Sequence, residues 1–162
     1  IRDEFIKGIQ KAKSVSNYLK MIQKLGMFNQ IFPGLNINSR FIKTSDYIVQ
    51  ITNLLKGNDW KLVQRKLNTL KYINQEIRSI VHLLKLYIFK PNDIFLIKKE
   101  QENTKLTPQQ IKQWASIAGN QVIKVWKFKL SVSSKEAISK GLKGKSIGDY
   151  IKNKEIELFK SS

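Results

Sequence analysis

Residues 134–159 read SKEAISKGLKGKSIGDYIKNKEIELF, a pattern that predicts a short helix, a glycine turn and a second helix. Ser134 carries a hydroxyl that accepts hydrogen bonds from free first-turn amides, so we expect it to be the N-cap. Gly141 suits the left-handed conformation that ends a helix, and Gly144 permits a tight turn before the next one. Apolar residues at helical spacing would face the core from the second helix, namely Ile147, Ile151, Ile156 and Phe159.

The turn between these two helices is expected to be exposed and basic. Amides at the start of a helix attract phosphate, because their dipoles point toward it and no backbone group competes. We therefore predict a phosphate-binding site that comprises Lys135, Lys140, Lys143, Gly144, Lys145 and Ser146. The turn is not a Walker phosphate loop, because Ser139 stands where that motif needs its first glycine. The alternative is a helix–turn–helix that only packs against the core.

The rest of the chain repeats the helical spacing of apolar residues and lacks the alternation typical of strands. The sequence therefore predicts an all-α protein, an irregular multi-helix array in two lobes. Residues 1–90 would form a neck and body lobe, and residues 107–162 a tail lobe. Residues 91–106 are polar and mixed in charge, so they are expected to form the linker region between the lobes. Thr107 followed by Pro108 is typical of a helix start.

Local signals place several other helix boundaries. Short oxygen-bearing side chains satisfy first-turn amides, and the expected N-caps are Ser14 or Ser16, Thr44 or Ser45, Asn58 or Asp59, and Thr107. Residues 25–35 read LGMFNQIFPGL. They are expected to form a corner whose apolar side chains join the core, because Pro33 disfavours helix at Phe32.

The charge of the chain favours a polyanionic partner. Its 162 residues include 30 Lys and Arg against 12 Asp and Glu, which gives a net charge of +18 that is spread along the length. Nucleic acid is the first partner to expect; the alternative is a solvated surface in a lysine-rich proteome. Arginine is scarce, so contact with backbone and shape is favoured over bidentate reading of bases.

Other residue types exclude several kinds of site. The chain has no cysteine, hence no disulfide and no thiolate metal site. The single histidine, His82, excludes a multi-histidine metal centre and is expected to be satisfied or at the surface. No carboxylates cluster as metal-dependent nucleotide transfer requires, and Glu155 and Glu157 are expected on the surface. No apolar run is long enough for a membrane span. We expect an intracellular protein and make no prediction of its compartment.

A second basic stretch lies at residues 121–130, QVIKVWKFKL. Its lysines, Lys124, Lys127 and Lys129, are interleaved with Trp126 and Phe128. Such a pattern suits a nucleic-acid surface on which rings stack against bases or sugars. In the alternative interpretation both rings belong to the core and the lysines line its rim.

Three stretches resemble one family, the bacterial-type (class II) tRNA nucleotidyltransferases, which are the CCA-adding enzymes and their poly(A) polymerase relatives. In that family a short helix leads into a turn of glycines and lysine and a last helix, and the positions that match are Gly141, Lys143, Gly144, Ile147 and Gly148. Residues 25–35 match a Leu-Gly passage that ends in Phe-Pro-x-Leu, and residues 1–7 are similar to the neck. Lys145 stands where proline is usual, and Glu136 where aspartate is usual.

The resemblance implies that the chain is the helical body and tail that holds tRNA by backbone and shape while a separate head adds nucleotides. The catalytic Gly-Ser turn, the Asp-x-Asp pair and the nucleotide-selecting segment of the family have no match here. We therefore predict no catalytic residue and no metal in this chain, and leave open whether it is part of an enzyme. Mg²⁺ and CTP or ATP would belong to the head.

Two alternatives remain. The first is a non-catalytic RNA-binding subunit of a larger ribonucleoprotein assembly with the same fold. The second is a DNA-binding helix–hairpin–helix at residues 134–151. In that motif the two glycines flank a single hydrophobic residue, whereas Gly141 and Gly144 flank both Leu142 and Lys143.

Overall fold

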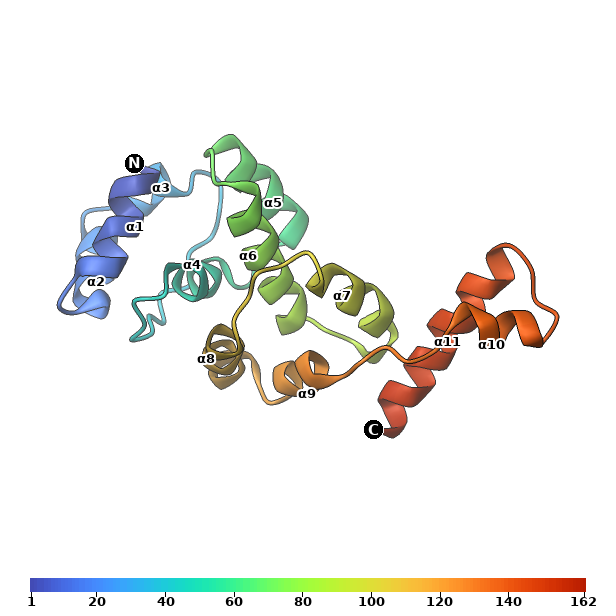
Figure 1. Cartoon of the computed structure of the whole chain (residues 1–162). Coiled ribbons are helices and arrows are strands. Elements are labelled where there is room, and N and C mark those ends of the chain that lie inside the picture. The colour runs from blue at the N-terminus through green and yellow to red at the C-terminus, as the bar shows by residue number, and fades with distance from the viewer.

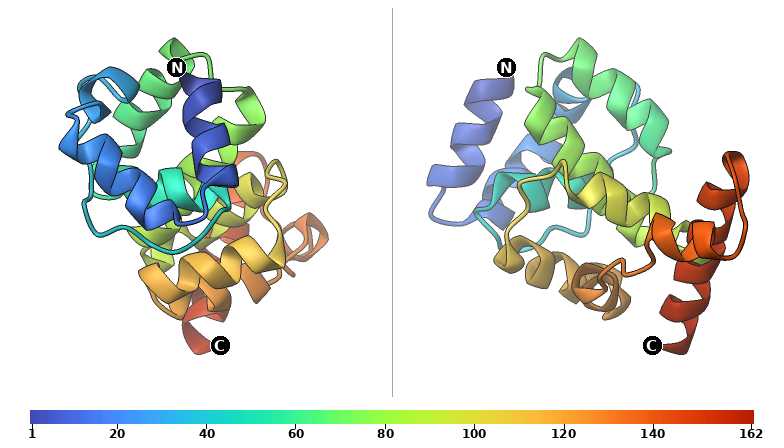
Figure 2. Two further views of the ribbon diagram at one scale, coloured as in Figure 1. Left: turned by 90° about the vertical axis from the view of Figure 1, so that its left-hand side faces the viewer. Right: turned by 45° about the vertical axis from the view of Figure 1, so that its right-hand side comes forward.

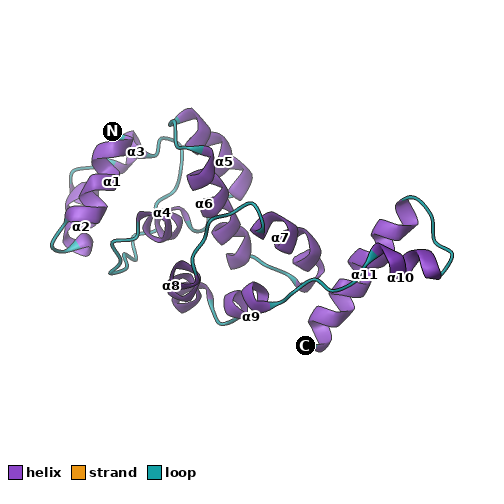
Figure 3. Ribbon diagram, in the orientation of Figure 1, coloured by secondary structure: helices purple, strands orange, loops and turns teal.

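The computed structural model describes residues 1–162 and is all-α, as predicted, with no strand (Figure 3). The elements in chain order are α1 (Arg2–Lys11), α2 (Val15–Lys24), α3 (Phe28–Ile31), α4 (Tyr47–Leu55), α5 (Trp60–Thr69), α6 (Asn74–Tyr87), the 3-10 turn η1 (Pro91–Asp93), α7 (Ile94–Gln101), α8 (Pro108–Ala118), α9 (Gln121–Lys127), α10 (Ser134–Ser139) and α11 (Lys145–Ser161). The two termini lie at opposite ends of the molecule (Figure 1). None of the helices combines the length and the apolar character that crossing a membrane requires.

Helix α6 is the central element, and α4, α5, α7 and α8 pack around it (Figure 2). Most of its residues are buried because apolar side chains occur on more than one face. The indole of Trp114 in α8 is fully buried, and its Nε1 donates to the carbonyl oxygen of Leu83 at 2.8 Å. A buried indole N–H needs such a partner, so this bond fixes how α8 lies against α6.

The N-terminal helices are joined to α6 through Glu76. Its buried carboxylate accepts hydrogen bonds from the guanidinium of Arg2 in α1 and, at 2.9 Å, from the hydroxyl of Tyr47 in α4. It also accepts from its own helix, because the amide of Ile73 donates to it at 3.1 Å. A single carboxylate therefore links α1, α4 and α6.

The corner at residues 25–35 is buried in part, because Met27, also expected in the core, is only half-buried and Leu25 is 63% exposed. Phe28, Ile31 and Phe32 belong to the core. Phe5 of α1 packs edge-on against Phe32, with ring centroids 5.5 Å apart, and also against Phe28. Edge-to-face packing is a favourable arrangement for aromatic rings, so the corner fixes how α1 lies against the core at the N-terminal end of the molecule (Figure 1).

Three of the expected N-caps are confirmed, namely Ser14, Asp59 and Thr107. The cap of α4 is instead Asp46, whose Oδ1 accepts from the amide of Val49 at 3.1 Å. The hydroxyl of Thr44 is engaged differently, because it accepts from the amide of Asp46. The cap of α10 is Ser133 and not Ser134, which is the first helical residue.

Residues 91–106, the predicted linker region, contain η1 and α7. Ile94 and Ile97 of α7 belong to one cluster of 33 buried side chains, which extends from Phe5 to Phe159. These residues are therefore packed into the core and not extended between lobes. The division of the chain into lobes 1–90 and 107–162 stays a prediction.

His82 differs from its expectation, because it is neither at the surface nor satisfied. Its side chain is 2% exposed, and neither ring nitrogen has a hydrogen-bond partner. Burial, and then the nearby charges of Lys85 and Lys98, lower the pKa of His82 from 6.5 to about 4. The imidazole is therefore neutral in the folded protein at pH 7, whereas the unfolded chain takes up a proton below pH 6.5.

This difference predicts an acid-dependent loss of stability. The cost of keeping His82 neutral is absent above pH 6.5 and grows as the pH falls to 4, where it reaches roughly 3 kcal/mol. His82→Leu should leave the free energy of unfolding at pH 7 unchanged or higher, because it removes unpaired buried polar atoms. Urea unfolding of both proteins at several pH values measures the difference, and identical pH slopes between 6.5 and 4 would contradict it.

Candidate nucleic-acid interface

The predicted phosphate site lies on a hairpin formed by α10 and α11, which extends to one side of the body (Figure 1). Helix α10 ends as expected, because Gly141 is left-handed with φ of +80°. The amide of Gly141 donates to the carbonyl of Ile138 at 2.9 Å, and that of Leu142 to the carbonyl of Ala137 at 3.3 Å. These two bonds satisfy the last carbonyls of α10, so the chain leaves the helix in one defined direction.

The turn into α11 depends on Gly144, which has φ of +60° and ψ of −135°. An L-residue with a side chain is strained in this region. The hydroxyl of Ser146 accepts from the amide of Lys143 at 3.1 Å and donates to the carbonyl of Lys143 at 2.6 Å. The Ser146 side chain is thus occupied inside the turn. The amides of Lys145 and Ser146 begin α11 and make no hydrogen bond, so they remain open to an anion.

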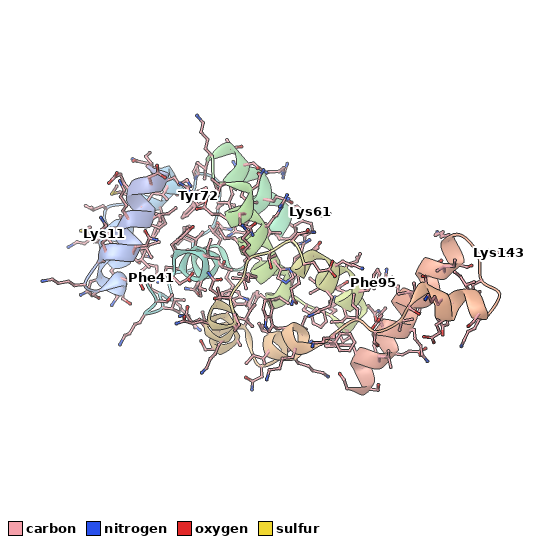
Figure 4. All side chains as sticks on the ribbon, viewed as in Figure 1. Lys11, Phe41, Lys61, Tyr72, Phe95 and Lys143 are labelled. Atoms are coloured by element: carbon pink, nitrogen blue, oxygen red, sulfur yellow. The ribbon has the colours of Figure 1, made fainter.

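The lysines predicted for this site do not all gather at the turn. Lys143 and Lys145 are exposed at the turn and form no salt bridge, and Figure 4 shows Lys143 at the outer tip. Lys135 is exposed at the start of α10, so the length of that helix separates it from the turn. The Nζ of Lys140 lies 5.1 Å from the ring centroid of Tyr150, and the interaction with Tyr150 raises the pKa of Lys140.

The hairpin is attached to the body through Glu155, a residue expected at the surface. Glu155 is fully buried, and its Oε1 accepts from the amides of Ser131 at 2.7 Å and Val132 at 2.6 Å. The expectation failed because Glu155 shares the inward face of α11 with Ile151 and Phe159, at intervals of four residues. That spacing was the signal in the sequence that could have revealed it. Glu157 is exposed as expected.

Aromatic packing completes this attachment. The ring of Phe159 lies edge-on to Phe128 at 5.2 Å and to Phe89 at 5.5 Å between centroids. Ile147, Ile151 and Ile156, which were expected to face the core, are only half-buried. The end of α11 near Phe159 is therefore the anchored end, and the glycine turn lies at the opposite, free end.

The second predicted surface, at residues 121–130, has half-buried rings, as in the core interpretation, and exposed lysines, as both interpretations require. Trp126 and Phe128 are half-buried and pack against the core, while Lys124, Lys127 and Lys129 are exposed. The Nζ of Lys124 lies 4.8 Å from the ring centroid of Phe159. Residues 126–130 and the end of α7 line a hollow of about 530 Å³ that is open to solvent, and Lys127 and Lys129 belong to its wall.

These residues include no candidate metal centre. The structure contains no group of three or more His, Asp or Glu side chains placed to hold a metal ion. No protein-family model matches the chain, and neither a curated protein nor a solved structure matches it. The resemblance to tRNA nucleotidyltransferases therefore stays a prediction.

The role of Glu155 is testable by substitution. Glu155→Ala leaves two amides without their charged acceptor, so we expect a loss of about 2 kcal/mol in the free energy of unfolding. Hydrogen exchange at the amides of Ser131 and Val132 should become much faster. The matched control is Glu157→Ala, which removes only an exposed pair with Lys154 and should cost about 0.5 kcal/mol or less. Unchanged exchange in the Glu155 variant would show that packing alone holds the hairpin.

Proposed function

We propose that this chain binds structured RNA through phosphate contacts, with the α10–α11 turn as one point of contact. Following the resemblance, the RNA is tRNA, and the chain is the helical body and tail of a CCA-adding type nucleotidyltransferase whose head adds the nucleotides. The single observation that carries the proposal is the turn itself. Two open amides, at Lys145 and Ser146, lie at the start of a 17-residue helix beside two exposed lysines without acidic partners.

Physical chemistry favours phosphate as the ligand of this turn. The partial positive charge at the start of α11 and the two ammonium groups add to one another. Successive free amides form a concave site for a single anion, and flanking lysines reach neighbouring phosphates along a nucleic-acid strand. The net charge of +18 raises the affinity for any polyanion, so affinity alone does not distinguish this turn from the rest of the surface.

The placement of the turn favours a large ligand. The tip lies at the opposite end of α11 from the C-terminus and apart from α9 (Figure 1), whose last two residues line the hollow. A ligand that contacts both surfaces must extend along the molecule, as the stem of a folded RNA does. Recognition of an RNA stem proceeds mostly by shape and by phosphate and 2′-hydroxyl contacts, which agrees with the use of lysine at the tip.

The double substitution Lys143→Ala and Lys145→Ala tests this site. We expect binding to a tRNA to weaken about tenfold, with a slope of log affinity against log salt that is shallower by about two. The melting temperature should hardly change, because exposed lysines contribute little to folding. Fluorescence anisotropy with labelled tRNA at several salt concentrations measures both quantities.

The matched control removes the same charge elsewhere, by Lys20→Ala and Lys24→Ala, which are exposed on α2 at the other end of the molecule. If both double variants lose the same affinity, net charge accounts for binding and the turn is not a contact. A wild-type affinity that does not change with salt would refute the proposed function itself.

A glycine substitution separates the backbone from the lysines. Gly144→Val places a β-branched residue at φ of +60°, so we expect lower RNA affinity together with a loss of about 1–3 kcal/mol in stability. Gly148→Ala is the control, because Gly148 lies within α11 with open space around its α-carbon. It should raise stability by about 0.5–1 kcal/mol and leave RNA binding unchanged. A Gly144 variant with full stability and full affinity would disprove the role of the turn.

A further inference from the structure

Lys98 of α7 is a buried cation with no acidic partner. It is 8% exposed, and its Nζ donates to the carbonyl oxygens of Val125 at 3.1 Å and Trp126 at 2.9 Å, and to Oε1 of Gln101 at 2.9 Å. No carboxylate lies within salt-bridge distance of it. Burial lowers the pKa of Lys98 to about 8, so the ammonium is still mostly charged at pH 7.

This cation lies in the wall of the 530 Å³ hollow, together with Lys127 and Lys129. Buried charges in proteins are generally paired. The three carbonyl-type acceptors use the hydrogens of Lys98 but bring no negative charge. Three lysines and one carboxylate thus line the hollow, and its volume is within the range of small-molecule sites.

Three further groups in the same wall narrow the chemistry of the ligand. Trp126 is half-buried and offers an aromatic surface. Gln101 has its amide oxygen occupied by Lys98, while its amide nitrogen bonds to no protein group. The carboxylate of Glu102 is exposed and forms no salt bridge. The wall thus combines cations, an aromatic ring, a free donor and a free acceptor.

We propose that this hollow binds one unpaired nucleotide, with its phosphate at Lys127 and Lys129 and its base against Trp126. A simple inorganic anion would contact only the lysines, and the negative charge of Glu102 would repel it. A nucleotide uses all of the groups, because its base stacks on an aromatic ring and accepts from the Gln101 amide. Its exocyclic amino group or ribose hydroxyl donates to Glu102.

The inference rests on the proposed function, since the unpaired nucleotide is taken to belong to the bound RNA. The hollow and the hairpin are mechanically linked, because Ser131 and Val132 directly follow the hollow and bond to Glu155 of α11. An RNA could therefore place its stem near the hairpin and a single-stranded end in the hollow. Free nucleotides share the same chemistry, so the experiment contains a separate arm for them.

The experiment compares a labelled RNA hairpin that has a blunt end with the same hairpin carrying four unpaired nucleotides at its 3′ end. The wild-type chain should bind the extended RNA about tenfold more tightly, because one stacked base contributes on that scale. Trp126→Leu should reduce this preference, taken as the ratio of the two affinities measured on the same variant, to about twofold or less. An extension of abasic sites should bind to the wild-type chain no better than the blunt RNA.

Trp60→Leu is the matched control, because Trp60 is also half-buried beside lysines but lies on α5 and does not line the hollow. It should keep the full preference. The double variant Lys127→Ala and Lys129→Ala provides a second test that spares the core, and it should also lower the preference. Its control is the Lys20 and Lys24 double variant.

The outcomes separate the two proposals. Equal affinity of the wild-type chain for both RNAs, with steep salt dependence, would overturn the nucleotide site and leave RNA binding intact. Failure to bind either RNA would overturn both. Loss of the preference in the Trp60 variant would also overturn the site. Competition by millimolar AMP that abolishes only the preference would support the site and assign it to free nucleotides as well.

Discussion

The carboxylate of Glu155 is the contact on which the position of the α10–α11 hairpin, the candidate interface, depends. It accepts from two consecutive amides of the segment that leaves α9 and comes from the helix that carries the glycine turn. Without it, the hairpin would be held by α11 packing on α7 and η1 and by the rings around Phe159. Edge-to-face contacts between rings would tolerate a rotation of the hairpin relative to the body. The two hydrogen bonds to one carboxylate oxygen would not, because both amides must keep pointing at that oxygen. The direction of the tip relative to the body is therefore set by a charge.

Charged side chains also connect other helices of the structure. Glu76 links α1, α4 and α6, and Lys98 links α7 to the carbonyl end of α9. Lys85 of α6 lies 3.9 Å from the ring centroid of Trp60 in α5 and 2.6 Å from Glu100 in α7. Apolar contacts between short helices allow many crossing angles, whereas a buried charge is stable only where its partners lie. These charges thus select one arrangement of the helices.

Helix positions were predictable from local signals. The contacts between helices at Glu76, Lys85 and Lys98 were not. Spacing and caps suffice for Thr107 and Asp59, because each cap bonds within its own first turn. Where several oxygen-bearing residues adjoin, as at Ser133 and Ser134 or at Thr44 and Asp46, the backbone path selects one. Lys98 is separated by 27 residues from the carbonyl of Val125 that it binds, so no local pattern indicates its burial. The glycine turn was predicted because its geometry is local, whereas the withdrawal of Lys140 toward Tyr150 was not.

The buried contact at Glu76 and the two candidate contact surfaces use different basic residues. The planar guanidinium of Arg2 donates to the buried carboxylate of Glu76 and lies 5.1 Å from the ring centroid of Tyr72. Arginine suits this position because its forked group can bond a carboxylate and stack on a ring at once. In both candidate contact surfaces, the turn and the hollow, the only basic residues are lysines. Lysine acts as a point charge toward any phosphate and does not read base edges. Selectivity in such a protein must then come from the distance between its contact points and from groups such as Trp126 and Gln101. The charged contacts between helices fix that distance. The interior charges therefore determine how the two proposed RNA-contacting surfaces are spaced.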